Sequence, residues 1–111
     1  MTHFTIDRAD GVSVIRPDGR LNMLSAPQFS TVVRELVAEG CARLVVDLSS
    51  TEFIDSSGLG ALVASLKVVR QAGGDLRLAA ATSQVDTALQ LTNLNRVLQP
   101  SATVVDACAL V

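Results

Sequence analysis

Phe53-Ile54-Asp55-Ser56-Ser57-Gly58-Leu59-Gly60 is the stretch around which the rest of the chain can be arranged, because it joins an apolar strand to an apolar helix. The apolar run Arg43–Leu48 precedes it and predicts the strand. Apolar residues recur at helical spacing after it, at Leu59, Leu62, Val63, Leu66 and Val69. Asp, Ser and Gly are typical of helix starts, so a helix is expected to begin here. Unpaired N–H groups and the helix dipole favour an anion at such a start.

The same stretch holds more polar groups than helix capping requires. One capping side chain is enough, yet Asp55, Ser56 and Ser57 stand together. Capping alone would give these residues no further function. Gly58 and Gly60 follow, and their small size would let another molecule approach the turn closely. The junction is therefore the candidate functional site.

The residues before the junction predict a hairpin and a helix. Strand-like segments Phe4–Asp7 and Val12–Arg16 flank the turn signal Ala9-Asp10-Gly11, which indicates an antiparallel pair. Pro17-Asp18-Gly19 predicts a second turn, after which Arg20–Met23 either continues the sheet or forms a loop.

A helix follows this segment. Ser25-Ala26-Pro27-Gln28 is typical of a capping box with Pro in the first turn, and the helix is expected to end at Gly40.

The residues after the junction continue the alternation of helices and strands. Gly73-Gly74 should end the helix, and a strand should begin at Asp75. Thr82-Ser83 with Asp86 indicates another helix start, and Val97-Leu98 is expected to form a last short strand. Residues 103–111 form either a short helix or a frayed end. This order predicts an α/β fold in which an opening antiparallel hairpin and later parallel strands form a mixed sheet covered by helices.

Composition excludes several classes of protein. With 111 residues, of which 49% are hydrophobic, the chain is expected to form one domain over residues 1–111. Its net charge is −2 and its nine Lys and Arg residues are scattered, so neither nucleic acid nor a membrane surface is an expected partner. No apolar run approaches the roughly 20 residues of a membrane span, and the first residues lack signal-peptide features. We expect a cytoplasmic protein.

Composition also bears on cofactors and partners. Cys41 and Cys108 are far apart and accompany a single His, so no metal site, disulfide framework or cofactor is expected. Only 18% of the residues are charged, which leaves apolar surface available for a protein partner.

No catalytic constellation emerges. A serine nucleophile elbow needs Gly two residues before the Ser, whereas Asp55 stands before Ser57, and the only candidate base is His3. The Gly-Lys-Ser/Thr signature of a phosphate loop is absent. Asp47 and Asp55 are better interpreted as a strand-end residue and a helix cap than as a catalytic pair. The chain is expected not to be an enzyme, unless a pocket brings His3 to the serines.

The chain resembles the STAS domain family, and within it the single-domain bacterial anti-sigma factor antagonists. The resemblance rests on Val45-Val46-Asp47-Leu48 followed by Phe53–Gly60, with weaker matches at Gly19-Arg20-Leu21-Asn22, at Gly73-Gly74, and at Leu94 with Val97-Leu98. It implies partner switching. The unphosphorylated protein would bind an anti-sigma factor that is also a serine kinase, phosphorylation in the turn would break the complex, and a phosphoserine phosphatase would reset it.

The resemblance also assigns residues. The second hydroxyl of the turn, Ser57, would be the phosphorylated one, with Ser56 as the alternative. The residues expected to contact the partner are Asn22, Met23, Asp55, Ser56, Gly58, Leu59 and Gly60. Another reading makes the chain a STAS subunit or scaffold of a transporter-associated or stress-signalling complex.

Asn22 departs from the family pattern, in which Asp is common at this place. Asn removes a charge that would repel phosphoserine but keeps the capacity for hydrogen bonding. It is either a determinant of partner choice or an ordinary loop residue.

Overall fold

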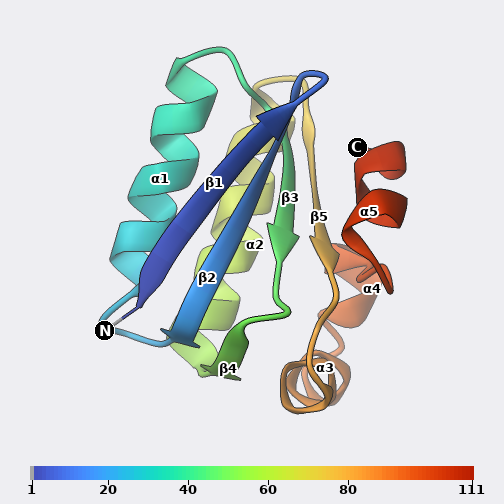
Figure 1. Cartoon of the computed structure of the whole chain (residues 1–111). Coiled ribbons are helices and arrows are strands. Elements are labelled where there is room, and N and C mark those ends of the chain that lie inside the picture. The colour runs from blue at the N-terminus through green and yellow to red at the C-terminus, as the bar shows by residue number, and fades with distance from the viewer. Residues whose placement is uncertain (1) are drawn as a thin grey trace.

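The computed structural model describes residues 2–111. In this range a pair of strands precedes each of the helices α1 and α2, and a single strand then precedes the helices α3, α4 and α5 (Figure 1). Their bounds are β1 His3–Ala9, β2 Val12–Leu21, α1 Ala26–Ala38, β3 Arg43–Asp47, β4 Thr51–Ile54, α2 Ser56–Gln71, β5 Asp75–Ala79, α3 Ser83–Leu91, α4 Asn95–Leu98 and α5 Val104–Leu110.

The sheet is mixed, as the sequence predicts. Strands β1 and β2 pair antiparallel, and β3 and β5 continue the sheet in parallel, in the order β1-β2-β3-β5. Strand β4 pairs in parallel with the last part of β2, beyond the residues that pair with β3. Thus β2 pairs with β3 along its first part and with β4 along its last part. Because β2 and β4 are parallel, the residues that follow them lie at the same end of the molecule.

The prediction of a turn at Pro17-Asp18-Gly19 is wrong, because β2 runs through these residues to Leu21. Pro17 stands opposite Phe4 of β1, and its carbonyl accepts a hydrogen bond of 3.0 Å from the buried Thr51 hydroxyl. The irregularity of the chain appears instead as a shift of register between Gly19 and Arg20. Of the two alternatives for Arg20–Met23, the strand holds for Arg20 and Leu21 and the loop for Asn22 and Met23.

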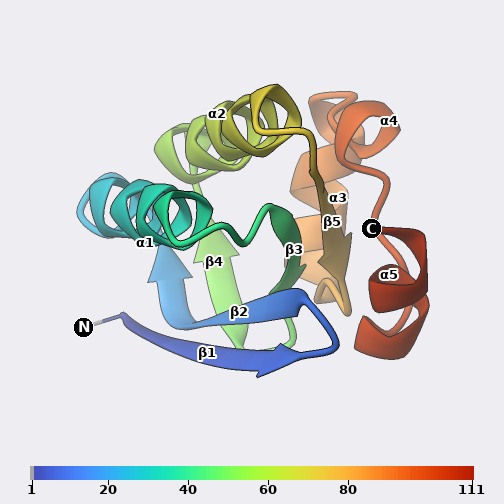
Figure 2. The same ribbon diagram turned by 90° about the horizontal axis from the view of Figure 1, so that it is seen from above.

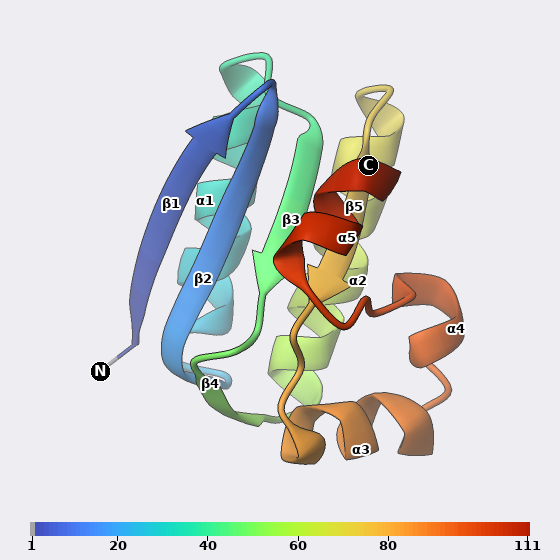
Figure 3. The ribbon, with the colours of Figure 1, turned by 45° about the vertical axis from the view of Figure 1, so that its right-hand side comes forward.

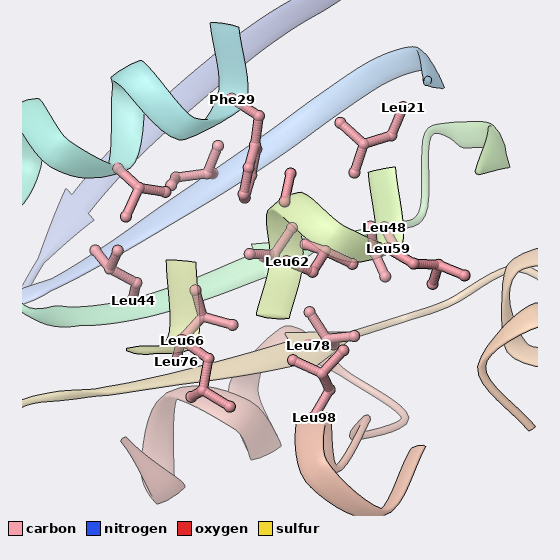
Figure 4. Close-up of a cluster of buried hydrophobic side chains, with 14 of the residues drawn as sticks. Leu21, Phe29, Leu44, Leu48, Leu59, Leu62, Leu66, Leu76, Leu78 and Leu98 are labelled. Carbon is pink, nitrogen blue, oxygen red and sulfur yellow. The ribbon is translucent and has the colours of Figure 1, made fainter. Parts of the chain in front are cut away.

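Helices cover both faces of the sheet. Helices α1 and α2 lie side by side on one face, and α5 packs against β3 and β5 on the other (Figures 2 and 3). The main core lies between the sheet and α1 and α2, where Phe29 of α1, Leu62 of α2 and Leu44 of β3 converge (Figure 4). Burial of these apolar side chains is what holds α1 and α2 in place.

Two local predictions are wrong. Helix α1 forms where expected, but Ser25 makes no side-chain cap, because its hydroxyl donates to the Arg20 carbonyl at 2.7 Å and accepts from the Asn22 N–H at 3.0 Å. Val97-Leu98 belongs to the short helix α4 instead of a strand. Leu98 is buried, so its apolar character reflects the core and not a strand. The last segment takes the helical alternative, as α5.

Candidate functional site

Asp55 is the N-cap of helix α2 and lies at one end of the sheet, directly after β4. The Asp55 carboxylate accepts a hydrogen bond of 2.9 Å from the Gly58 N–H, and its carbonyl accepts one of 2.9 Å from the Leu59 N–H. This arrangement is the N-cap that the sequence predicts. It satisfies two donors of the first turn with one residue.

Asp55 also binds the loop between β2 and α1. Its second carboxylate oxygen accepts from the Met23 N–H at 3.2 Å, and its own N–H donates to the Leu21 carbonyl at 3.3 Å. The sequence predicted the cap but not this second contact. One side chain therefore joins the start of α2 to the loop that carries Asn22 and Met23.

The Asn22 side chain stabilises that loop by hydrogen bonds to the backbone that follows it. Its side-chain oxygen accepts from the N–H groups of Leu24, at 3.0 Å, and Ser25, at 3.2 Å. These bonds satisfy donors just before α1, a task that an Asp oxygen would perform equally well. The contacts favour the interpretation of Asn22 as a loop residue.

The two serines of the turn are open to solvent. Both Ser56 and Ser57 are exposed, and within residues 2–111 neither hydroxyl makes a hydrogen bond. Their N–H groups are the first two of the helix, which have no intrahelical partner. Each hydroxyl is therefore accessible to a reagent from outside and lies beside free backbone donors.

The two glycines of the turn differ in surroundings. Gly58 is buried, and a Cβ atom there would lie 2.2 Å from the Leu21 carbonyl oxygen and 2.8 Å from Ile54. A Cβ on Gly60 would meet nothing within 4 Å. Gly60 therefore leaves room for another molecule, as expected for both glycines. At Gly58 the missing side chain instead allows α2 to lie close to β2.

The residues expected to contact a partner gather around this turn. Met23, Ser56 and Gly60 are exposed, Asn22 and Asp55 are partly exposed, and Gly58 and Leu59 are buried. A partner role for these residues stays a prediction. If Gly58 and Leu59 take part, they do so through the shape of the helix more than through exposed side-chain area.

Exposed apolar side chains flank the turn. Met23 is 70% exposed and Leu24 is 78% exposed on one side, and Phe53 is 47% exposed on β4. Sequence reasoning missed Leu24 and Phe53, although the low charged fraction signalled apolar surface in general. Apolar side chains in contact with water beside a polar turn are typical of protein-binding surfaces.

The enzymatic alternative gains no support from the arrangement. The groove beside Ser56 is lined by residues of α2 and of the loop after α3, and His3 is not among them. Asp47 accepts a hydrogen bond of 3.0 Å from the Ser49 N–H, as a strand-end residue would. Within residues 2–111, no group of three or more His, Cys, Asp and Glu side chains gathers to hold a metal.

The fold and the site together define a small α/β domain with an accessible serine turn framed by apolar side chains, which is an arrangement typical of a protein-binding module. A model of the STAS domain family matches residues 3–107. A Thermotoga maritima protein named as an anti-sigma factor antagonist is 33% identical over 99 residues, which make up 88% of either chain. The chain therefore belongs to the STAS domain family.

Solved structures agree with this assignment. A crystal structure of an anti-sigma factor antagonist from Thermotoga maritima covers 97% of this chain and 93% of its own, with a TM-score of 0.90 and 32% identity. One from Mycobacterium paratuberculosis covers 100% and 94%, with a TM-score of 0.89 and 29% identity. The phosphorylated form of the Bacillus protein SpoIIAA, at 19% identity, covers 95% and 96% with a TM-score of 0.73 and shares the fold.

A helix that crosses a membrane must be long and apolar. The helices found in residues 2–111 are each too short or too polar to span a lipid bilayer.

Proposed function

We propose that this STAS domain is an anti-sigma factor antagonist whose binding to an anti-sigma factor ends when Ser57 is phosphorylated. The observation that carries the proposal is the pair of exposed hydroxyls at the start of α2, in a chain whose relatives bear the antagonist name. The partner is an anti-sigma factor with serine kinase activity, and a phosphoserine phosphatase reverses the modification. The cytoplasm, where sigma factors act, is the proposed location.

The start of α2 suits a phosphorylated side chain. A phosphate adds a charge of about −1.5 to −2. The free N–H groups of Ser56 and Ser57 and the positive end of the helix dipole offset this charge. The domain can therefore accept the modification without unfolding, so the switch acts by changing the surface.

The surroundings of the turn explain why the modification would release a partner. Exposed Met23, Leu24 and Phe53 suit an apolar contact that excludes water. A phosphate carried into such a contact would lose its hydration without gaining enough partners, and facing acidic groups would repel it. Affinity for the anti-sigma factor should fall sharply.

The chemistry of the modification belongs to the kinase. The Ser57 hydroxyl oxygen forms a bond to the γ-phosphorus of ATP, the bond from that phosphorus to the bridging oxygen breaks, and ADP leaves. A base on the kinase takes the hydroxyl proton. This chain needs to supply only an accessible hydroxyl, as both Ser56 and Ser57 do.

The test of the site uses a purified anti-sigma factor kinase from the bacterium that encodes this chain. Incubated with it and ATP, wild-type protein and Ser56→Ala should each gain one phosphate by intact-mass spectrometry, and Ser57→Ala should gain none. Full phosphorylation of Ser57→Ala would rule out Ser57. If Ser56→Ala alone blocked the reaction, the site would move to Ser56.

The test of the switch is calorimetry with the same anti-sigma factor. Ser57→Glu should bind at least tenfold more weakly than the wild type, because the introduced charge mimics part of the phosphate. The matched control is Ser57→Gln, which has similar size and no charge and should retain most of the affinity. Equal affinity of Ser57→Glu and the wild type would contradict the switch.

A further inference from the structure

The sheet face opposite α1 and α2 carries the short helix α5 (Figure 3). Beneath it lies a second apolar cluster, formed by Val12 of β2, Val45 of β3, Ala79 of β5 and Ala107 of α5 itself. Within residues 2–111, the main core on the other face contains no residue of α5. The apolar packing of α5 is therefore separate from that of the rest of the domain.

Helix α5 has little to stabilise it apart from this cluster. It has seven residues, and isolated helices shorter than about 12 residues are marginal in water. Among the described residues of α5 only Ala107 is buried, whereas α1 buries larger side chains such as Phe29 and Val33. Val105 and Leu110 of α5 are 79% and 55% exposed. Helix α5 is thus held by much less buried apolar area than α1.

One side chain of the sheet holds the far end of α5. The Nε and Nη2 atoms of Arg43 donate to the Val111 carbonyl oxygen, at 3.1 Å and 3.0 Å. Arg43 is exposed, so water can replace either partner when these bonds break. The contact can therefore open and form again without leaving a buried polar group unpaired.

The near end of α5 follows an anchored residue. The Ser101 N–H donates to the Leu78 carbonyl at 2.9 Å, and the Ser101 carbonyl accepts from the Ala80 N–H at 3.0 Å. These bonds attach Ser101 to the edge of β5. Ala102 and Thr103 come next, and both are exposed and lie outside any strand or helix. A rotation at these two residues would move α5 while the chain up to Ser101 stays in place.

These features together describe a lid with a hinge. We propose that α5 opens and closes over the second apolar cluster as one unit, with residues 102–103 as the hinge and the Arg43 contact holding it closed, while the main core stays folded. Opening uncovers Val12, Val45 and Ala79, so the domain exposes apolar sheet surface without unfolding. The inference concerns the face opposite α1 and α2 and is independent of the proposed function.

Hydrogen exchange of the full chain, followed residue by residue by NMR, tests the lid. Amides of a unit that opens separately exchange more readily than amides that open only with the whole domain. After correction for intrinsic rates, the amides of residues 107–110 should exchange at least about 100-fold faster than those of Leu62 and Leu66 in α2. The Ser101 amide lies before the hinge and should exchange more slowly than those of α5.

Two results of this experiment would overturn the proposal. Equal protection of α5 and α2 would mean that α5 opens only when the whole domain unfolds. A gradient in which Leu110 exchanges rapidly and Ala107 is as protected as α2 would indicate fraying of the last turn instead of a lid that moves as one unit.

Two variants test what keeps the lid closed. Arg43→Met keeps a long side chain without its donors and should raise the exchange rates of residues 107–110 about fivefold. Ala107→Asp places a charge in the second apolar cluster and should release α5, so that these amides lose nearly all protection. The matched controls are Arg34→Met on the exposed side of α1 and Val105→Asp on the exposed side of α5. Neither control should speed exchange in α5.

In both test variants the amides of Leu62 and Leu66 should keep their protection to within about twofold, because the main core is not involved. Equal acceleration of α5 and α2 in Arg43→Met would make Arg43 a support of the whole fold and would contradict a lid. Loss of the whole fold in Ala107→Asp, seen by circular dichroism, would place α5 in the same cooperative unit as the core and would also overturn the proposal. No anti-sigma factor enters these measurements, so their failure leaves the proposed function untouched.

Discussion

Helices α1 and α2 start at the same end of the molecule, yet their first turns use serine in opposite ways. Before α1, the Ser25 hydroxyl is buried and holds the Arg20 carbonyl and the Asn22 N–H. At the start of α2, the hydroxyls of Ser56 and Ser57 make no hydrogen bond within residues 2–111. The side-chain cap of the helix comes from Asp55. The Ser25 hydroxyl is thus buried and engaged in the fold, whereas the Ser56 and Ser57 hydroxyls are exposed and make no hydrogen bond that a modification would remove.

The two starts are nevertheless one structural unit. Asp55 accepts from the Met23 N–H, and the Leu21 carbonyl, which accepts from the Asp55 N–H, lies against Gly58. The loop before α1 therefore positions the first turn of α2. Substitutions on either side should show which groups hold the unit together and which are free to act.

The largest effect is expected from Gly58→Ala. The added Cβ would lie 2.2 Å from the Leu21 carbonyl oxygen, so the helix must move away from β2. The free energy of unfolding, measured by chemical denaturation, should fall by about 3 kcal/mol.

Gly60→Ala is the control for this substitution. Its Cβ meets nothing within 4 Å, and replacing a helical glycine should raise the free energy of unfolding by about 0.5 to 1 kcal/mol. Similar effects at both positions would contradict the close approach of α2 to the end of β2.

A smaller loss is expected from Ser25→Ala. The Ser25 side chain is buried, and removal of its hydroxyl takes one hydrogen bond from the Arg20 carbonyl and one from the Asn22 N–H. The cost should be about 2 kcal/mol in the free energy of unfolding. Ser56→Ala should change it by less than about 0.5 kcal/mol, as is usual at exposed positions. If the two variants were equally stable, the contrast between the two starts would be lost.

Asp55→Ala should cost about 1 kcal/mol, because the cap of α2 and the contact with the Met23 N–H are both removed. Asp55→Asn keeps one side-chain oxygen and should lose less. Denaturation of the two variants in parallel measures the difference. A loss in Asp55→Asn as large as in Asp55→Ala would mean that the charge, and not the hydrogen bond, supports the turn.

The smallest effect is expected from Asn22→Asp. The side-chain oxygen that serves the Leu24 and Ser25 N–H groups is retained, so stability should stay within about 0.5 kcal/mol of the wild type. Asn22→Ala removes this acceptor and should cost about 1 kcal/mol. Thermal unfolding monitored by circular dichroism can rank the three proteins. Equal stability of the wild type and both variants would contradict the conclusion that the Asn22 side-chain oxygen stabilises the loop.

Much of the fold is local in origin and was predictable. The turn at Asp10-Gly11, the strand Arg43–Asp47 and the helix start at Asp55 each follow from residue type and spacing within a few positions. The failures have a different cause. Pro17-Asp18-Gly19 has the composition of a turn, but pairing with β1 on one side and the Thr51 contact on the other hold it extended.

The sequence predicted which residues stand at the start of α2 but not how they are arranged there, and their role in a site stays a prediction. The sequence placed polar groups and glycines at the start of α2, and the structure agrees. It could not show that Gly58 faces the backbone of β2 while Gly60 faces open space, since the two residues are chemically identical. Nor could it show that the Ser25 hydroxyl donates to the Arg20 carbonyl, because that contact depends on the path of the chain after the shift of register between Gly19 and Arg20.

The turn between β1 and β2, at Asp10 and Gly11, lies at the end of the molecule opposite the start of α2 (Figure 1). For measurements on a sensor surface, an anchor at this turn would hold the domain with its serine face directed toward the solution. An anchor near Thr2 would be a poor choice, because the Thr2 hydroxyl donates to the Arg20 carbonyl, close to the loop that frames the site. The same geometry would allow a fluorescent reporter at the β1–β2 turn to follow association without touching the surface that binds.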